Sequence, residues 1–226
     1  MPLTFNGDTP ERIIYNNNVV DKVKYGDDVV WEAPIPHEYE EVGYLLADKR
    51  LDLGIKTDQN KHIYCEFIRV SRTKSQRIYG SDVSGSLTTN TSAYISSTST
   101  SVNWRFGNKT TNISVSLGEH TSVQNKNGVW IDGTKEGSYT DVNDFVSNNN
   151  LSLFDNLTGG ASECNVAISR MLVREIDGQP GVPDHRWVAV KRLSDNVYGF
   201  YDTVTKNFHT NDEAEIIEYV EPQEDA

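Results

Sequence analysis

Residues 188–211, VAVKRLSDNVYGFYDTVTKNFHTN, gather side chains that could take part in acid–base chemistry: Arg192, Asp195, Asp202 and His209. Histidine and aspartate are the residues most used for general acid–base catalysis. Both aspartates, however, stand at turn positions, where a carboxylate accepts backbone N–H bonds. The segment therefore predicts two hairpins that close a fold, with the arginine and the histidine solvated rather than reactive. Three of its side chains are expected to pack: Tyr198, Phe200 and Val204.

A second pattern, REIDGQPG, matches the first half of the Glu-x-Asp-x-x-Glu strand of some β-glucanases and agarases through Glu175 and Asp177. Retaining glycosidases need two carboxyl groups about 5–5.5 Å apart. The second glutamate falls on Pro180, which carries no acid and does not suit a central strand. The pair is incomplete, so we expect no enzyme and keep a glycoside hydrolase as the alternative function.

The other polar clusters match no cofactor or metal motif, and none is predicted. The five histidines lack the spacing of a zinc site. Four aspartates lie in loop-like stretches but lack the spacing of a calcium loop: Asp132, Asp141, Asp144 and Asp155. The chain has two cysteines, Cys65 and Cys164, both in apolar strand-like stretches, and the sequence leaves their pairing open.

The elements that must position these residues are strands. Short runs of alternating apolar and polar residues are bounded by Gly, Asn and Asp, and no run of ten residues has helical periodicity. KHIYCEFIRV is apolar on both faces, which is typical of a central strand. The Ser/Thr-rich residues 71–101 predict edge strands and a long loop. QNKNGVWIDG predicts a hairpin with Asn127 and Gly128 as its two-residue turn.

Changes in composition divide the chain into four parts. Residues 1–32 predict a small β module with a hairpin in DKVKYGDDVVW, residues 33–41 a proline-containing linker, residues 42–211 the main domain, and residues 212–226 an acidic tail. The net charge of −12 argues against a nucleic-acid partner. No apolar run is long enough for a membrane span, and MPLTFNGDTPE lacks a secretory signal, so work outside a cell would need another route of release, such as lysis inside an assembled particle.

The order of the main-domain segments resembles laminin-G-like domains, which have a concanavalin A-like jelly-roll fold. The resemblance covers about residues 42–211 and rests on LDLGIKTDQNKHIYCEF, QRIYGSDV, WRFGN, QNKNGVWIDG, NLSLFDN and the closing WVAVKRLSDNVYGFYDTVTKNFHTN. Asn196 stands where the family motif has glycine, and asparagine also suits a turn that needs a positive φ. The resemblance implies an all-β sandwich of two antiparallel sheets, preceded by a small β-hairpin module.

Such domains occur in structural proteins of tailed bacteriophages and in surface proteins of gut bacteria. The N-terminal pattern LTFNG, IIYNN, VDKVKYG and VVW also resembles a short module of phage virion proteins. The resemblance implies a virion fibre, spike or decoration protein that attaches to other virion proteins through residues 1–32, forms a homo-oligomer with a trimer favoured, and adheres to a host-surface glycan. Glycan binding needs an exposed aromatic ring, and four residues in loop-like contexts are candidates: Tyr79, Tyr94, Trp130 and Tyr139.

Overall fold

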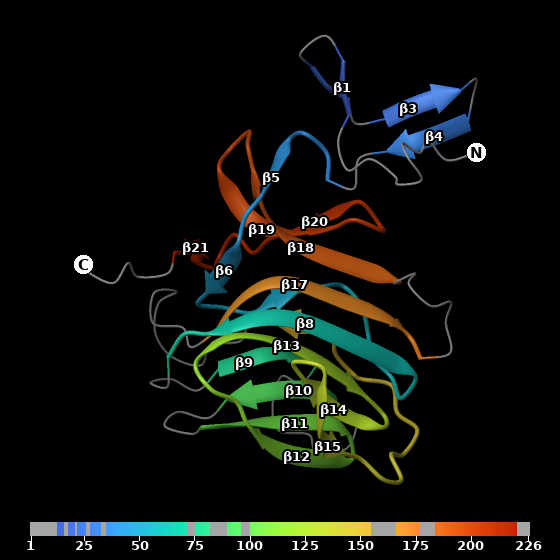
Figure 1. Ribbon diagram of the computed structural model, residues 1–226, viewed down its shortest axis with the longest axis vertical. Coiled ribbons are helices and arrows are strands. Elements are labelled where there is room, and N and C mark those ends of the chain that lie inside the picture. Colours follow the sequence, from blue (N-terminus) through green and yellow to red (C-terminus); the bar gives the residue numbers. More distant parts are fainter. Residues whose placement is uncertain are drawn as a thin grey trace.

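The described part of the protein is built from antiparallel strands and contains no helix (Figure 1). The computed structural model describes residues 13–15, 18–20, 22–25, 28–32, 35–71, 76–81, 90–95, 100–154, 166–176 and 184–220, the first four as strand backbone only. These strands form two large sheets and two separate hairpins. The prediction of an all-β protein with two antiparallel sheets is confirmed.

The smaller of the two large sheets has six strands. In spatial order they are β12 (Lys109–Ser114), β11 (Ser101–Gly107), β10 (Asn90–Ile95), β9 (Gln76–Gly80), β16 (Ser152–Leu153) and β7 (Leu51–Asp52). β9 and β10 come from the Ser/Thr-rich region predicted to supply edge strands, but both lie inside the sheet. Small side chains explain this placement, because Ser92 and Ala93 are buried within the packed sheet.

The larger sheet has eleven strands. Its main path runs β15 (Thr134–Ser138), β14 (Gly128–Ile131), β13 (Gly118–Asn125), β8 (Lys61–Arg69), β17 (Val166–Glu175), β18 (His185–Arg192), β19 (Val197–Asp202) and β20 (Asn207–His209). Three further strands pair beside this path: β5 (Tyr39–Glu41), β6 (Tyr44–Ala47) and β21 (Ile216–Tyr219). β8 is central, between β13 and β17, as its two apolar faces predict.

The main sheet extends beyond residues 42–211 at both ends. β5, inside the predicted linker, pairs with β18, and β21, inside the predicted acidic tail, pairs with β6. Each brings apolar side chains to the outer face of the larger sheet. The Tyr39 ring lies 4.8 Å from that of Tyr201, and Ile217 and Tyr219 pack against the cluster of Leu46, Ile68 and Ala167. Burial of these side chains explains why both segments pair as strands instead of remaining in solvent.

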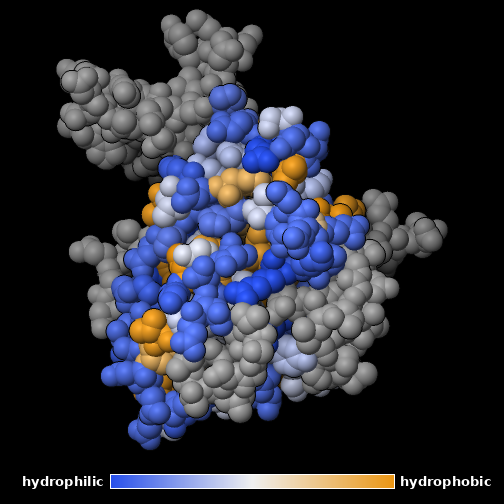
Figure 2. Space-filling view, turned by 180° about the vertical axis from the view of Figure 1, so that it is seen from behind, coloured by the Kyte–Doolittle hydropathy of each residue, from blue (hydrophilic) through white to orange (hydrophobic). Residues whose placement is uncertain are grey.

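One apolar core lies between the two large sheets, an arrangement consistent with a jelly-roll β-sandwich. Its largest buried side chains come from both layers: Phe67, Tyr79, Trp104, Phe106, Phe154, Trp187 and Phe200. Direct contacts join the layers, because Phe154 after β16 packs on Phe200 of β19. The outside is mostly hydrophilic on the face seen in Figure 2, where hydrophobic residues form small separate patches.

The N-terminal region contains two hairpins that pair only within themselves in the described part of the chain. β1 (Ile13–Tyr15) pairs with β2 (Asn18–Val20), and β3 (Lys22–Tyr25) pairs with β4 (Asp28–Glu32). The second pairing confirms the hairpin predicted in DKVKYGDDVVW. In Figure 1 both hairpins lie beyond the end of the body that carries β5 and β20.

The closing segment forms two hairpins, as predicted, from β18, β19 and β20. Asn196 has a φ of 60° in the first turn, in agreement with its place at a glycine position. Phe200 is fully buried and Tyr198 packs against the core. The prediction for Val204 is wrong, since its side chain is 46% exposed in the second turn, where its N–H is bonded to Asp202.

Candidate functional site

The candidate site is a groove on the outer face of the larger sheet, over β8, β17 and β18. Strand pairing places Tyr64 opposite Leu172, and Leu172 opposite Arg186. Their chain neighbours Ile63 and Trp187 are buried in the core. Because side chains alternate along a strand, these three residues point away from the core. Strands far apart in the sequence therefore build one continuous surface.

The groove has a volume of about 330 Å³, which lies in the range of small-molecule sites. Tyr64 and Leu172 supply its apolar part. Polar and charged side chains on the same three strands supply the rest: His62, Glu66, Arg170, Arg174 and Arg186. An apolar surface surrounded by hydrogen-bonding groups is the composition that sugar rings require.

The one acid of the groove is held by its neighbours. Glu66 accepts hydrogen bonds from the Tyr64 hydroxyl at 2.7 Å and the Ser169 hydroxyl at 3.2 Å. Its carboxylate also lies 3.6 Å from Arg170, and Arg170 lies 3.6 Å from Glu41. Burial and the bond to Glu66 raise the pKa of Tyr64, so its hydroxyl stays protonated and continues to donate. Glu66 and Glu41 together offset the charge of Arg170.

His62 adds a polar group without a charge at neutral pH. Burial, with a smaller contribution from the positive charge of Arg174, lowers the pKa of His62 to about 4. Its Nδ1 lies 3.4 Å from the amide nitrogen of Asn125. The uncharged ring can therefore exchange a hydrogen bond with a ligand hydroxyl but does not neutralise a charge.

The four aromatic residues predicted as ligand contacts divide into two pairs. Tyr79 and Tyr139 are buried, with relative exposures of 0% and 7%. The Tyr79 hydroxyl donates to Gln124 Oε1 at 2.9 Å, and Gln124 Nε2 donates to the Tyr139 hydroxyl at 3.0 Å. The prediction of exposed rings is wrong for these two residues, because both rings pack in the core and use their hydroxyl groups to satisfy a buried amide.

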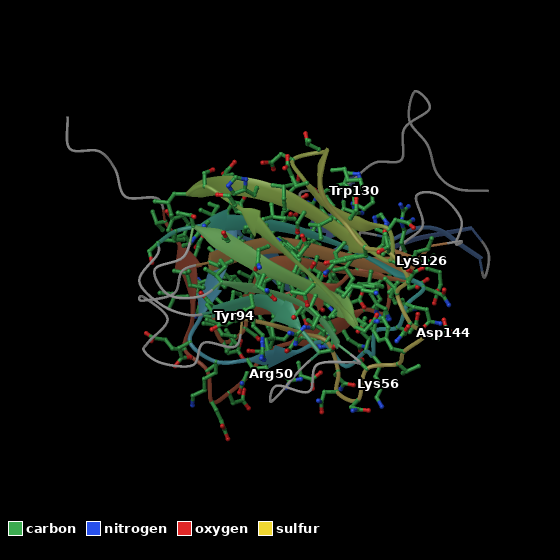
Figure 3. The ribbon with its side chains drawn as sticks, turned by 90° about the horizontal axis from the view of Figure 1, so that it is seen from below. Arg50, Lys56, Tyr94, Lys126, Trp130 and Asp144 are labelled. Atoms are coloured by element: carbon green, nitrogen blue, oxygen red, sulfur yellow. The ribbon has the colours of Figure 1, made fainter. Side chains whose placement is uncertain are left out.

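Tyr94 and Trp130 remain partly exposed, but they lie on different sides of the body (Figure 3). Tyr94 points outward from the six-stranded sheet, between the buried Ala93 and Ile95. Trp130 points outward from the larger sheet, and Lys135 Nζ lies 5.2 Å from the centre of its ring. The cross-strand row that contains Tyr64 continues through β13 to Trp130. Trp130 is therefore the predicted residue that shares a face with the groove.

Replacing Tyr79 with phenylalanine is expected to lower the free energy of unfolding by about 1–2 kcal/mol, because Gln124 Oε1 loses its buried donor. Chemical denaturation measures the change. Tyr94→Phe is the matched control in the adjacent strand, where the ring points outward, and we expect it to alter stability little. Equal losses of unfolding free energy for the two substitutions would contradict a stabilising role of the buried hydrogen bond between Tyr79 and Gln124.

Glu175, the first residue of the glycosidase-like pattern, forms an ion pair with Lys61. Lys61 Nζ also lies 3.4 Å from Asp184 Oδ2. Burial alone would lower the pKa of Lys61, but the hydrogen bond to Glu175 and the nearby Asp184 outweigh it and raise that pKa. Asp177 and Pro180 lie outside the described residues. The geometry gives Glu175 a role in joining β17 to β8.

A second cavity, of about 550 Å³, contains a Ser–His–Asp chain that the sequence analysis did not identify. Ser116 Oγ lies 3.2 Å from His120 Nε2, and His120 Nδ1 lies 2.8 Å from Asp132 Oδ2. Serine hydrolases use this order of groups. Here the backbone carbonyl of Ser116 is also 3.2 Å from Nε2. In the tautomer whose Nδ1 donates to Asp132, Nε2 carries no proton and accepts from the Ser116 hydroxyl.

Asp132 has a structural task in the same cluster. Its Oδ1 accepts the backbone N–H of Thr121 at 2.8 Å, and its own N–H donates to the Thr121 carbonyl at 2.9 Å. Burial alone would raise the pKa of Asp132, but the hydrogen bonds from Thr121 and His120 outweigh it and lower that pKa. We therefore assign Ser116, His120 and Asp132 to bracing β13 against the turn after β14.

Within the described ranges, no three His, Cys, Asp or Glu side chains lie close enough to hold a metal ion. Of the aspartates considered for calcium, Asp155 lies outside these ranges. Cys65 is a buried free thiol, and burial raises its pKa. Cys164 lies outside the described residues.

No helix in the described part of the chain is long and apolar enough to cross a bilayer.

No family model matches the chain, and no curated protein matches it significantly. The groove on β8, β17 and β18 is therefore interpreted from its own geometry.

Proposed function

We propose that this chain is a structural protein of a bacteriophage virion, a fibre, spike or decoration component, with a lectin-like domain that adheres to a host-surface glycan. Residues 1–32 attach it to other virion proteins, and it assembles as a homotrimer. Host lysis releases the protein within the virion. The groove formed by β8, β17 and β18 binds the glycan, with Tyr64 and Leu172 under the sugar ring.

The composition and position of the groove carry this proposal. It combines an apolar surface with hydrogen-bonding groups from neighbouring strands, and Trp130 offers a further ring face in the same cross-strand row. The N-terminal hairpins support a separate attachment module, because they pair only with themselves in the described part of the chain. The resemblance of residues 42–211 to laminin-G-like phage domains supports the virion assignment.

Binding of labelled full-length protein to a panel of bacterial cells and their isolated wall polysaccharides tests the proposal. We expect saturable binding to at least one of them, weakened about tenfold or more when Leu172→Trp fills the groove. Val146→Trp is the matched control, because Val146 is 61% exposed and is not among the groove residues. Absence of saturable binding throughout the panel would remove the adhesin function.

The same protein preparations also test the oligomeric state and the alternative of a glycoside hydrolase. Light scattering is expected to give the mass of a trimer, and a strictly monomeric species would contradict a fibre. Reducing-sugar release from a polysaccharide panel, abolished by Glu175→Gln, would instead support the alternative of a glycoside hydrolase. An image of an assembled particle with this chain located in it tests the virion assignment directly.

A further inference from the structure

We infer that the groove on β8, β17 and β18 selects an anionic glycan, a sugar polymer that carries carboxylate or phosphate groups. This inference rests on the proposed function and specifies the ligand of the same site. Its basis is the balance of charge among the groove residues, which differs in sign from that of the whole chain.

The groove has an excess of positive charge. Three arginines and one glutamate line it, and the single acid Glu66 already interacts with Tyr64, Ser169 and Arg170. Arg174 and Arg186 form no ion pair with any described residue. The chain as a whole carries −12. Two groove arginines without a carboxylate partner among the described residues, in such an acidic protein, are the expected signature of an anion-binding site.

Strand register brings the two arginines to one groove. Arg174 lies opposite His62 on β8, and Arg186 lies opposite Leu172, two residues before Arg174 on β17. Each guanidinium offers a planar fork of N–H donors that matches carboxylate or phosphate oxygens. Arg170 adds a buried Nε that meets no acceptor in the described structure. The guanidinium groups of Arg174 and Arg186 line the groove and offer N–H donors to a ligand oxyanion.

The remaining side chains exclude a cationic ligand and suit a sugar that bears the anion. Glu66 is engaged, and His62 is uncharged at neutral pH, so neither offers a free negative charge. Tyr64 and Leu172 provide an apolar surface for the carbon face of the ring. The volume of about 330 Å³ suits a unit of a polymer better than a large folded partner.

Binding of the full-length protein to three polymers tests this inference: polygalacturonate, poly(glycerol phosphate) and neutral dextran. Titration calorimetry is expected to show binding to at least one of the two anionic polymers and none to dextran. The two anionic polymers distinguish a carboxylate ligand from a phosphate ligand. Failure of both to bind would overturn the inference.

Charge-reversal variants locate the site. Arg174→Glu with Arg186→Glu is expected to weaken binding of the anionic polymer about tenfold or more, and the corresponding double lysine variant less, because lysine keeps the charge but not the fork. Arg77→Glu with Arg105→Glu is the matched control, since both residues point outward from the six-stranded sheet and the net charge changes equally. Thermal unfolding checks that each variant folds.

The outcomes separate the inference from the proposed function. Equal weakening by both double glutamate variants would assign the effect to overall charge and overturn the inference. Cell binding that is unchanged by Arg174→Glu with Arg186→Glu would leave the adhesin function standing and remove its anionic specificity. Polymer binding that depends on these arginines, without binding to any cell, would support the anion site and contradict the adhesin.

Discussion

Replacing Asp202 with alanine is expected to lower the free energy of unfolding by about 3 kcal/mol, because several buried donors lose their acceptor. The Asp202 carboxylate is 1% exposed. It accepts bonds from His185 Nδ1 at 2.7 Å, the backbone N–H groups of Arg186 at 3.1 Å and Val204 at 3.0 Å, and the Thr205 hydroxyl at 2.8 Å. These bonds join β18, β19 and the turn before β20. Chemical denaturation at neutral pH measures the loss.

Asp195 provides the matched control for this substitution. It also stands in a turn of the closing segment, but it is exposed, where it pairs with Arg192 and accepts the N–H of Val197. Exposed ion pairs contribute little to stability because water and salt screen them. We therefore expect Asp195→Ala to change stability far less than Asp202→Ala. Similar losses for the two variants would contradict the central role of the buried carboxylate.

The contribution of Asp202 depends on pH in a defined direction. Burial alone would raise its pKa, but the hydrogen bonds from His185, the two backbone N–H groups and Thr205 outweigh this and lower the pKa below its ordinary value of 3.8. A carboxyl group with a lowered pKa in the folded protein stabilises above its unfolded pKa and loses that contribution as pH falls through the folded pKa. The stability difference between the wild type and Asp202→Asn should therefore shrink below about pH 4.

The sequence predicts the strands well, because their signal is local. Ile63, Cys65 and Phe67 recur at every second position, which predicts one buried face, and all three are buried. The positive φ of Asn196 follows from its place in a turn motif. Alternation of side chains and turn chemistry are properties of a few consecutive residues, so one sequence is sufficient to read them.

Strand position and burial are harder to predict, since both depend on distant partners. Ser/Thr-rich residues predict an edge, yet β9 and β10 lie inside the sheet, where the small side chains pack. Tyr79 has the polarity of a surface residue, but Gln124 on the opposite layer accepts its hydroxyl bond. Such long-range pairing leaves no pattern within either segment.

The groove illustrates the same limit. Arg170, Leu172 and Arg174 alternate along β17, so the sequence SRMLVRE indicates a strand with an arginine-bearing outer face. The arginine-bearing outer face of β17 could therefore be predicted from the sequence. What the sequence does not contain is the register that sets Tyr64 beside Leu172, since these residues are separated by more than a hundred positions and their pairing depends on the complete sheet. The basic groove follows from topology as much as from composition.

The second large effect is expected at Gly128, where replacement with alanine should cost about 3 kcal/mol or more of folding free energy. The predicted turn residues were Asn127 and Gly128, but Asn125 pairs with Gly128, so the turn consists of Lys126 and Asn127. The Asn125 side chain accepts the Asn127 N–H at 2.8 Å and starts the turn one residue earlier. Gly128 therefore begins β14.

Two features of this position exclude a larger residue. Gly128 has a φ of 142°, and a Cβ atom there would lie 2.1 Å from the carbonyl oxygen of Gly137 on β15. Gly133→Ala separates the cost of the positive φ from the cost of the steric clash. Gly133 has a φ of 80°, but no atom lies within 4 Å of an added Cβ there. That control should cost only the conformational part, about 1 kcal/mol. If both alanine variants unfold at the same denaturant concentration, β14 and β15 can move apart freely, and Trp130 is not held rigidly on the face that carries the groove.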